Sequence, residues 1–106
     1  MARREEKTVF SYDGASALLP EVRRLTEEAC REVESLAGGP SDSPAQVQEA
    51  VGRWAEAMIE RGLEVKGLWL VDFDNGSGYY CWKYPEPSLM FYHSYEEGFR
   101  GRMPIQ

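Results

Sequence analysis

The sequence predicts an α+β fold in which an antiparallel helical hairpin packs on a three-stranded antiparallel β-meander. Apolar residues recur every three or four positions up to Gly62, which is the spacing of amphipathic helices. From Leu63 apolar and polar residues alternate, which is the spacing of strands. Helices followed by strands are typical of α+β proteins. The 106 residues fit one domain over 1–106.

The first helix is predicted over residues 13–37, with Ser11 or Asp13 as its N-cap. Its apolar stripe alternates steps of three and four residues and consists of Ala15, Leu18, Val22, Leu25, Ala29, Val33 and Leu36. Pro20 falls inside this span. Because proline cannot donate a helical hydrogen bond, we expect a kink or a late start there.

The second helix is predicted over residues 44–61 and ends at Gly62. Ser43 followed by Pro44 is an N-cap with proline at the first helical position. The preceding loop, Gly38–Ser43, is rich in helix breakers and has only six residues. A connection this short favours an antiparallel hairpin, whose apolar stripes pack on each other or on a sheet.

Three strands are predicted next, over residues 63–73, 79–84 and 89–93. We expect the first to be bent or bulged at Gly67, since a glycine inside a strand often marks a bulge. The turn-forming segments 74–78 and 85–88 separate the strands and make them a meander. The C-terminal residues 94–106 are expected to form a loop.

The charge distribution argues against polyanionic partners. The net charge is −6, from 12 Lys and Arg against 18 Asp and Glu, and it divides into −2 over each of residues 1–37, 38–62 and 63–106. Because no segment is basic, we expect neither a nucleic-acid nor a membrane partner. The chain shows no signal-peptide pattern and no long apolar run, so a cytoplasmic location is expected.

Aromatic residues concentrate in the predicted sheet. Ten of the thirteen fall within residues 69–99: Trp69, Phe73, Tyr79, Tyr80, Trp82, Tyr84, Phe91, Tyr92, Tyr95 and Phe99. Aromatic side chains build cores and interfaces. The leading hypothesis is therefore a non-enzymatic homodimeric or protein-interaction module that uses this sheet. Stacking of bases is the less favoured use, and Trp82 is a candidate for ligand contact.

The alternative hypothesis is an enzyme or binding protein for a small anionic ligand. His93, the only histidine, would be its acid or base, with Asp72 or Glu86 as the orienting carboxylate. Arg100 and Arg102 would clamp the anion, because arginine binds carboxylate or phosphate in a bidentate manner. Two plainer interpretations stay open. His93 is a hydrogen-bonded structural group, and the arginines pair with Glu96, Glu97 or Asp72 and pin the tail to the sheet.

No metal, cofactor or disulfide is expected. Cys30 and Cys81 lie far apart without a CxxC pair, and Cys81 and His93 lack the paired spacing of zinc ligands. Lys83 could activate the Cys81 thiol, but buried cysteines are usually inert. Phosphate-loop, nucleophile-elbow, HExxH and dinucleotide motifs are absent from the sequence, which argues against an enzyme.

Several motifs occur in a characteristic order: Leu18-Leu19-Pro20, Val65-Lys66-Gly67, Leu70-Val71-Asp72-Phe73, Cys81-Trp82-Lys83, Glu86, His93 and Gly98-Phe99-Arg100-Gly101-Arg102-Met103-Pro104-Ile105. In this order they resemble the bacterial and archaeal domain-of-unknown-function family 2203. The resemblance implies a small cytoplasmic α+β protein of no established activity. Trp69 and Asp74 stand where the family pattern has glycine and proline. Ser94 stands where an acidic residue often follows the histidine, which weakens a histidine–carboxylate role.

Overall fold

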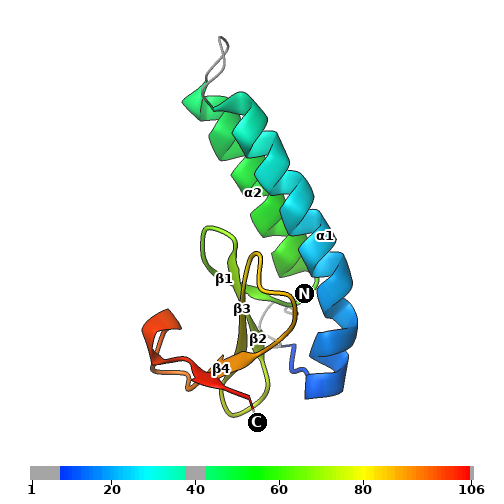
Figure 1. Cartoon of the computed structure of the whole chain (residues 1–106), viewed down its shortest axis with the longest axis vertical. Coiled ribbons are helices and arrows are strands. Elements are labelled where there is room, and N and C mark those ends of the chain that lie inside the picture. The colour runs from blue at the N-terminus through cyan, green and yellow to red at the C-terminus, as the bar shows by residue number, and fades with distance from the viewer. Residues whose placement is uncertain (1–7, 38–42, 106) are drawn as a thin grey trace, which may run out of the picture.

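A computed structural model describes residues 8–37 and 43–105 and confirms the α+β class (Figure 1). Two helices lie side by side, and an antiparallel sheet packs against one end of the pair. The sheet has five strands in the order β1-β2-β3-β4-β5, so the expected three-stranded meander is wrong. The elements are α1 (Tyr12–Leu36), α2 (Pro44–Glu60), β1 (Glu64–Gly67), β2 (Leu70–Asp74), β3 (Tyr79–Lys83), β4 (Phe91–His93), η2 (Phe99–Gly101) and β5 (Met103–Pro104).

Helix α1 begins at Tyr12 and continues through Pro20, so a late start is wrong. The Ser11 hydroxyl caps it by accepting a hydrogen bond from the Gly14 backbone N–H at 3.0 Å. This cap satisfies one of the free N–H groups of the first turn. The helix therefore starts early enough to place Ala15 in the core beside the sheet.

Helix α2 has the predicted cap. The Ser43 hydroxyl accepts a hydrogen bond from the Gln46 backbone N–H at 3.3 Å, and Pro44 is the first helical residue. Gly62 follows the helix with a φ of +91°, a left-handed conformation that glycine adopts without strain. The rest of the predicted connecting loop, residues 38–42, lies outside the described residues.

The segment predicted as one strand over 63–73 is instead a hairpin of β1 and β2. The chain reverses at Leu68 and Trp69, and the register shifts between Val65 and Gly67. Trp69 has a φ of +60°, which is strained for a bulky residue. Its ring packs on the Trp54 ring of α2 at a centroid distance of 4.9 Å, so a contact between distant segments stabilises the turn.

The C-terminal segment, predicted as loop over 94–106, contributes a fifth strand. Met103 of β5 pairs with Tyr92 of β4, and Pro104 pairs with Phe91. The short helix η2 precedes this strand. A strand of two residues is too short to show alternation in the sequence, which explains why the prediction omitted it.

The hydrophobic core lies between the helices and one face of the sheet. Val71, Phe73 and Trp82 from the sheet are fully buried against helical residues that include Val22 and Met58. Trp82 therefore belongs to the core and does not face a ligand site. The opposite face of the sheet, here called the outer face, points away from the helices and carries the alternate residues of β2 and β3.

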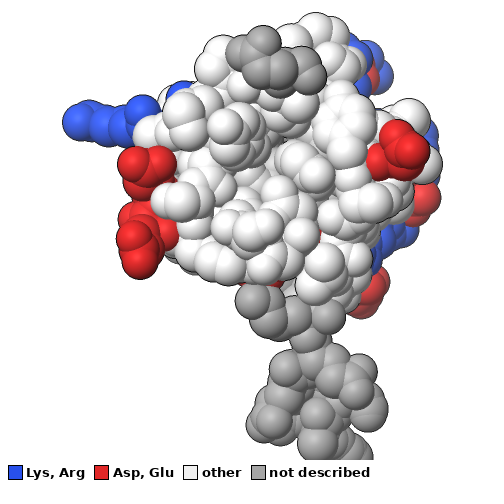
Figure 2. Space-filling model, turned by 90° about the horizontal axis from the view of Figure 1, so that it is seen from below, with Lys and Arg blue, Asp and Glu red and all other residues white. Residues whose placement is uncertain are grey.

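Charged side chains are missing from the middle of one end of the molecule. Figure 2 views this end, where the sheet lies, and shows Lys, Arg, Asp and Glu only toward its rim.

Within residues 8–37 and 43–105, no helix has the length and apolar character needed to span a bilayer.

Candidate functional site

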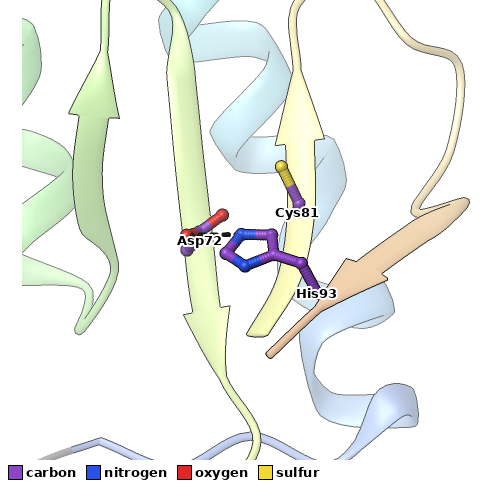
Figure 3. Close-up of side chains that lie close together, drawn as sticks. All are labelled: Asp72, Cys81 and His93. Atoms are coloured by element: carbon purple, nitrogen blue, oxygen red, sulfur yellow. Dashed lines mark hydrogen bonds and ion pairs between the residues drawn. The ribbon is translucent and has the colours of Figure 1, made fainter. Parts of the chain in front are cut away.

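The outer face brings Asp72, Cys81 and His93 together from three neighbouring strands (Figure 3). Asp72 of β2 pairs directly with Cys81 of β3, and His93 of β4 reaches across β3 toward the Asp72 carboxylate. All three side chains are buried, and one possible ligand atom from each lies within 4.8 Å of the other two. We call these residues the Asp72–Cys81–His93 cluster.

Both ring nitrogens of His93 face hydrogen-bond acceptors. Nδ1 lies 2.8 Å from the backbone carbonyl oxygen of Ser94, and Nε2 lies 3.0 Å from Oδ2 of Asp72. Because a carbonyl oxygen can only accept, Nδ1 carries a proton. Nε2 and the carboxylate oxygen therefore need a proton or another cation between them.

The Asp72 carboxylate is buried, but only one of its two oxygen atoms, Oδ2, has hydrogen-bond partners. Oδ2 also accepts a hydrogen bond from Lys66 Nζ at 3.0 Å. Oδ1 has no hydrogen-bond partner within the described part of the chain. Burial by itself would lower the pKa of Lys66, but the hydrogen bond and the charge of Asp72 outweigh it and raise that pKa. Lys66 therefore remains charged beside the cluster, with its Nζ 3.9 Å from the centre of the Tyr79 ring.

Cys81 is a protonated thiol in this environment. Burial raises its pKa to about 12, and the charge and hydrogen bonding of Asp72 add to the effect, while Arg102 acts in the opposite direction. A thiol is a poor nucleophile until it is deprotonated. At neutral pH Cys81 is therefore a weak nucleophile, and a metal or electrophile that binds its sulfur must displace the proton.

A pocket of about 230 Å³ lies over the cluster. Lys66 and Leu70 line it from the side of the hairpin, and Gly98 and Phe99 line it from the C-terminal segment. The volume suits a small ligand rather than a peptide or a nucleotide, since drug-sized pockets start at about 300 Å³.

The predicted arginine clamp is not assembled over this pocket. Arg102 Nη1 binds Glu86 Oε2 at 2.8 Å, and its guanidinium carbon lies 4.0 Å and 4.1 Å from the ring centres of Phe91 and Phe99. Arg100 is exposed to solvent. Arg102 thus pins the C-terminal segment to the sheet through Glu86, which is not one of the acidic partners expected from the sequence.

The other candidate carboxylate, Glu86, does not orient His93. Besides binding Arg102, its Oε1 accepts a hydrogen bond from the Lys83 backbone N–H at 2.9 Å. Its own carbonyl oxygen accepts from Trp82 Nε1 at 2.8 Å. Of the two carboxylates considered for His93, Asp72 is the one in contact.

Sequence reasoning missed two participants, Lys66 and the Ser94 carbonyl. Strand alternation places Lys66 and Asp72 on the same face, but only the reversal between β1 and β2 brings them close together. A backbone carbonyl leaves no signal in the sequence. Cys81 was assigned to the correct strand, but its contact with Asp72 depends on register.

Comparison with protein families gives one informative match. The model of an uncharacterized conserved protein family, DUF2203, matches residues 38–105, a range that includes α2, all five strands and the whole cluster. No curated protein and no solved structure matches the chain.

Proposed function

The chain belongs to the uncharacterised DUF2203 family. From the pocket over Asp72 and its buried carboxylate, we propose that the chain is a ligand-binding domain, not an acid–base enzyme. Its ligand is small and brings a positive charge or a hydrogen-bond donor to the buried carboxylate. This ligand differs from the anion of the alternative hypothesis drawn from the sequence.

The state of His93 argues for binding rather than proton transfer. In a catalytic histidine–carboxylate pair, the carboxylate holds one ring nitrogen and the other faces the substrate. Here Nδ1 donates to Ser94 and Nε2 faces Asp72, so neither nitrogen points at a substrate. The ring is held in place by both contacts and serves the site as a fixed group.

The observation that carries the proposal is the unpartnered Oδ1 of Asp72. Nearly all buried polar atoms in folded proteins have a hydrogen-bond partner, and exceptions are destabilising unless something else satisfies them. Oδ1 belongs to a residue that lines the pocket. A ligand that donates to Oδ1 or carries positive charge would remove this penalty, whereas an anion would add repulsion to it.

The test is a comparison of cationic and anionic ligands by amide NMR on the full chain. Methylguanidinium, ethylenediammonium and Zn²⁺ form the cationic set, and phosphate and citrate form the anionic set. At least one cation is expected to shift the amide signals of Gly98 and Phe99, which line the pocket. An anion that shifts them instead, or the failure of every cation to do so, overturns the proposal.

Self-association is a second candidate, supported by the uncharged end of the molecule (Figure 2). A shallow groove of about 740 Å³ runs there between Tyr12, Phe91 and Pro104, and all of its lining residues are uncharged. The partner proposed is a second copy of the chain, since apolar and aromatic surface is typical of homodimer interfaces.

Sedimentation velocity tests the dimer at concentrations on the order of tens of micromolar, where an ordinary interface is populated. A dimer is expected for the natural chain. Ile105→Glu, which places a charge in the groove, is expected to yield a monomer. A strict monomer for the natural chain rules out this candidate and leaves the ligand-binding proposal unaffected.

A further inference from the structure

We propose that the Asp72–Cys81–His93 cluster binds one divalent transition-metal ion of the zinc type, with the fourth coordination position open to the pocket. This inference rests on the proposed function, because it names the cation that the pocket takes. It departs from the expectation of no metal site.

The orientation of the histidine is the first argument. Histidine ligands to metals typically donate their second ring N–H to a carbonyl or carboxylate, which fixes the tautomer and the ring. His93 has this arrangement, because Nδ1 donates to the Ser94 carbonyl and leaves the Nε2 lone pair aimed at the cluster. Nε2 and the Asp72 carboxylate oxygen face each other at 3.0 Å, and a metal ion bound by both can take the place of a proton between them.

The donor set is the second argument. One nitrogen, one sulfur and one carboxylate oxygen are all accepted zinc ligands, and three protein ligands with an open fourth position are typical of sites that also bind a small molecule. The three donor atoms lie within 4.8 Å of one another. In a tetrahedral site, ligand atoms stand about 3.3 to 3.8 Å apart. His93 Nε2 and Asp72 Oδ2, now 3.0 Å apart, would separate by about 0.3 Å, and the more distant pairs would approach by about 1 Å.

Charge balance is the third argument. When the metal binds, the Cys81 S–H bond breaks, its proton passes to solvent, and the sulfur–metal bond forms. The two positive charges of the ion are then matched by the Asp72 carboxylate and the Cys81 thiolate. Lys66 loses its place on Asp72, but its Nζ already lies 3.6 Å from Glu64 Oε1, which can hold it. Arg102, the other nearby cation, is paired with Glu86, and its charge and hydrogen bond lower the pKa of Cys81, which favours the thiolate.

The unpartnered Oδ1 of Asp72, on which the proposed function also rests, is the fourth argument. This buried oxygen belongs to a side chain whose relative exposure is 1%. A structural ion pair between His93 and Asp72 explains Oδ2 but leaves Oδ1 unexplained. A metal ion bound by the Asp72 carboxylate would account for both of its oxygen atoms.

The experiment is a Co²⁺ titration of the full chain after treatment with a chelator and a thiol reductant. Tetrahedral Co²⁺ gives intense visible bands, and a cobalt–thiolate bond gives a charge-transfer band in the near ultraviolet. We expect both bands to saturate at one Co²⁺ per chain and to disappear when Zn²⁺ is added. Far-ultraviolet circular dichroism checks that each variant below is folded.

Cys81→Ser is expected to lose the charge-transfer band, while the matched variant Cys30→Ser keeps it. Cys30 is the other free thiol and lies on α1 outside the cluster. His93→Ala is expected to weaken Co²⁺ binding by at least about a hundredfold, since loss of even an outer-shell partner reduces metal affinity ten- to a hundredfold.

The metal proposal is overturned if the natural chain shows no thiolate band, or if Cys81→Ser retains it. These results come from the natural chain and from a serine replacement, so they do not depend on whether His93→Ala folds. If organic cations still shift the Gly98 and Phe99 amides, the ligand-binding function survives and only the metal fails. If neither organic cations nor metals bind, both proposals fail.

Discussion

The free thiols Cys81 and Cys30 occupy different environments, and their chemistry follows from these. Cys81 is buried next to Asp72, which with burial raises its pKa to about 12. Cys30 on α1 is partly exposed, and its pKa is raised first by burial and then by the charge and hydrogen bond of Glu34. Only the thiolate reacts as a nucleophile, and only Cys30 meets solvent in the native state.

In the metal-free native chain, iodoacetamide is therefore expected to alkylate Cys30 and leave Cys81 unmodified. Raising the pH from about 7 to about 10 speeds the reaction of Cys30, because its thiolate fraction rises, while Cys81 stays protonated in the native state. Mass spectrometry of native and urea-unfolded samples measures this difference. Equal rates for the two cysteines in the native chain would contradict the assigned burial and pKa of Cys81.

Between the helices, a buried polar contact joins α1 to α2, in addition to the exposed ion pair of Arg53 with Glu32. The Thr26 hydroxyl donates to the Val22 carbonyl oxygen at 2.8 Å and accepts from Trp54 Nε1, also at 2.8 Å. Thr26 is fully buried, although the apolar stripe of the sequence assigns its neighbour Leu25 to the core. The hydroxyl is therefore a specific connection between the helices inside an otherwise apolar interface.

Thr26→Val is expected to lower the free energy of unfolding by about 1–3 kcal/mol, because the buried Trp54 N–H loses its acceptor while the side-chain shape is kept. Thr26→Ser keeps the hydroxyl and is expected to lose less, about 1 kcal/mol for the missing methyl group. Urea unfolding followed by tryptophan fluorescence gives both values. A larger loss for serine than for valine would show that packing, not the hydrogen bond, dominates here.

Strands β3 and β4 approach each other closely at Gly78, just before β3 begins. A Cβ atom added there would lie 2.7 Å from the His93 carbonyl oxygen, closer than real Cβ atoms come to backbone. Gly78 thus allows β4 to place His93 beside β3. By contrast, a Cβ added at Gly52 in α2 meets nothing within 4 Å.

Gly78→Ala is expected to destabilise the chain by about 1–3 kcal/mol, since the added methyl forces β4 away. The matched variant Gly52→Ala is expected to stabilise it by up to about 1 kcal/mol, because alanine is favoured over glycine within a helix. Both values come from urea unfolding. If Gly78→Ala is as stable as the natural chain, the close packing of β4 on β3 is wrong.

Across the whole molecule, the C-terminal segment closes the outer face. Arg102 holds this segment through Glu86 and through the rings of Phe91 and Phe99. The Arg102 and Glu86 side chains are only 13% and 18% exposed, so solvent does not replace this contact easily. The same segment supplies Gly98 and Phe99 to the pocket wall.

Arg102→Ala is expected to destabilise the chain by about 1–3 kcal/mol, because Glu86 is left mostly buried without its partner. Amide hydrogen exchange over β4 and β5 should quicken as the segment loosens. Arg100→Ala, which removes an exposed arginine, should change stability by no more than about 0.5 kcal/mol. Equal effects of the two variants would contradict the pinning role of Arg102.

The sequence predicted those parts of the fold that local signals encode. The caps at Ser11 and Ser43 and the stop at Gly62 each follow from side-chain chemistry within one turn of a helix. The reversal at Leu68 and Trp69 has no such signal, since neither residue favours a turn and the ring contact with Trp54 stabilises it.

For the candidate site, sequence alone identified His93 and Asp72 as a possible pair but could not choose between Asp72 and Glu86. Strand register decides that choice, because it places Asp72 opposite Cys81 and within reach of His93. Glu86 instead forms an ion pair with Arg102 of the C-terminal segment. Side chains twelve or more positions apart carry no spacing signal when they meet across strands.

By itself the sequence determined the α+β class, the two helices and the alternation that separates a core face from an outer face, because these depend on periodicity and local backbone preferences. Only the tertiary structure decided the number of strands, the burial of Asp72, Cys81 and His93 in one cluster, and the role of Arg102. These depend on register and on contacts between residues far apart in the chain, and no local pattern of residues records them.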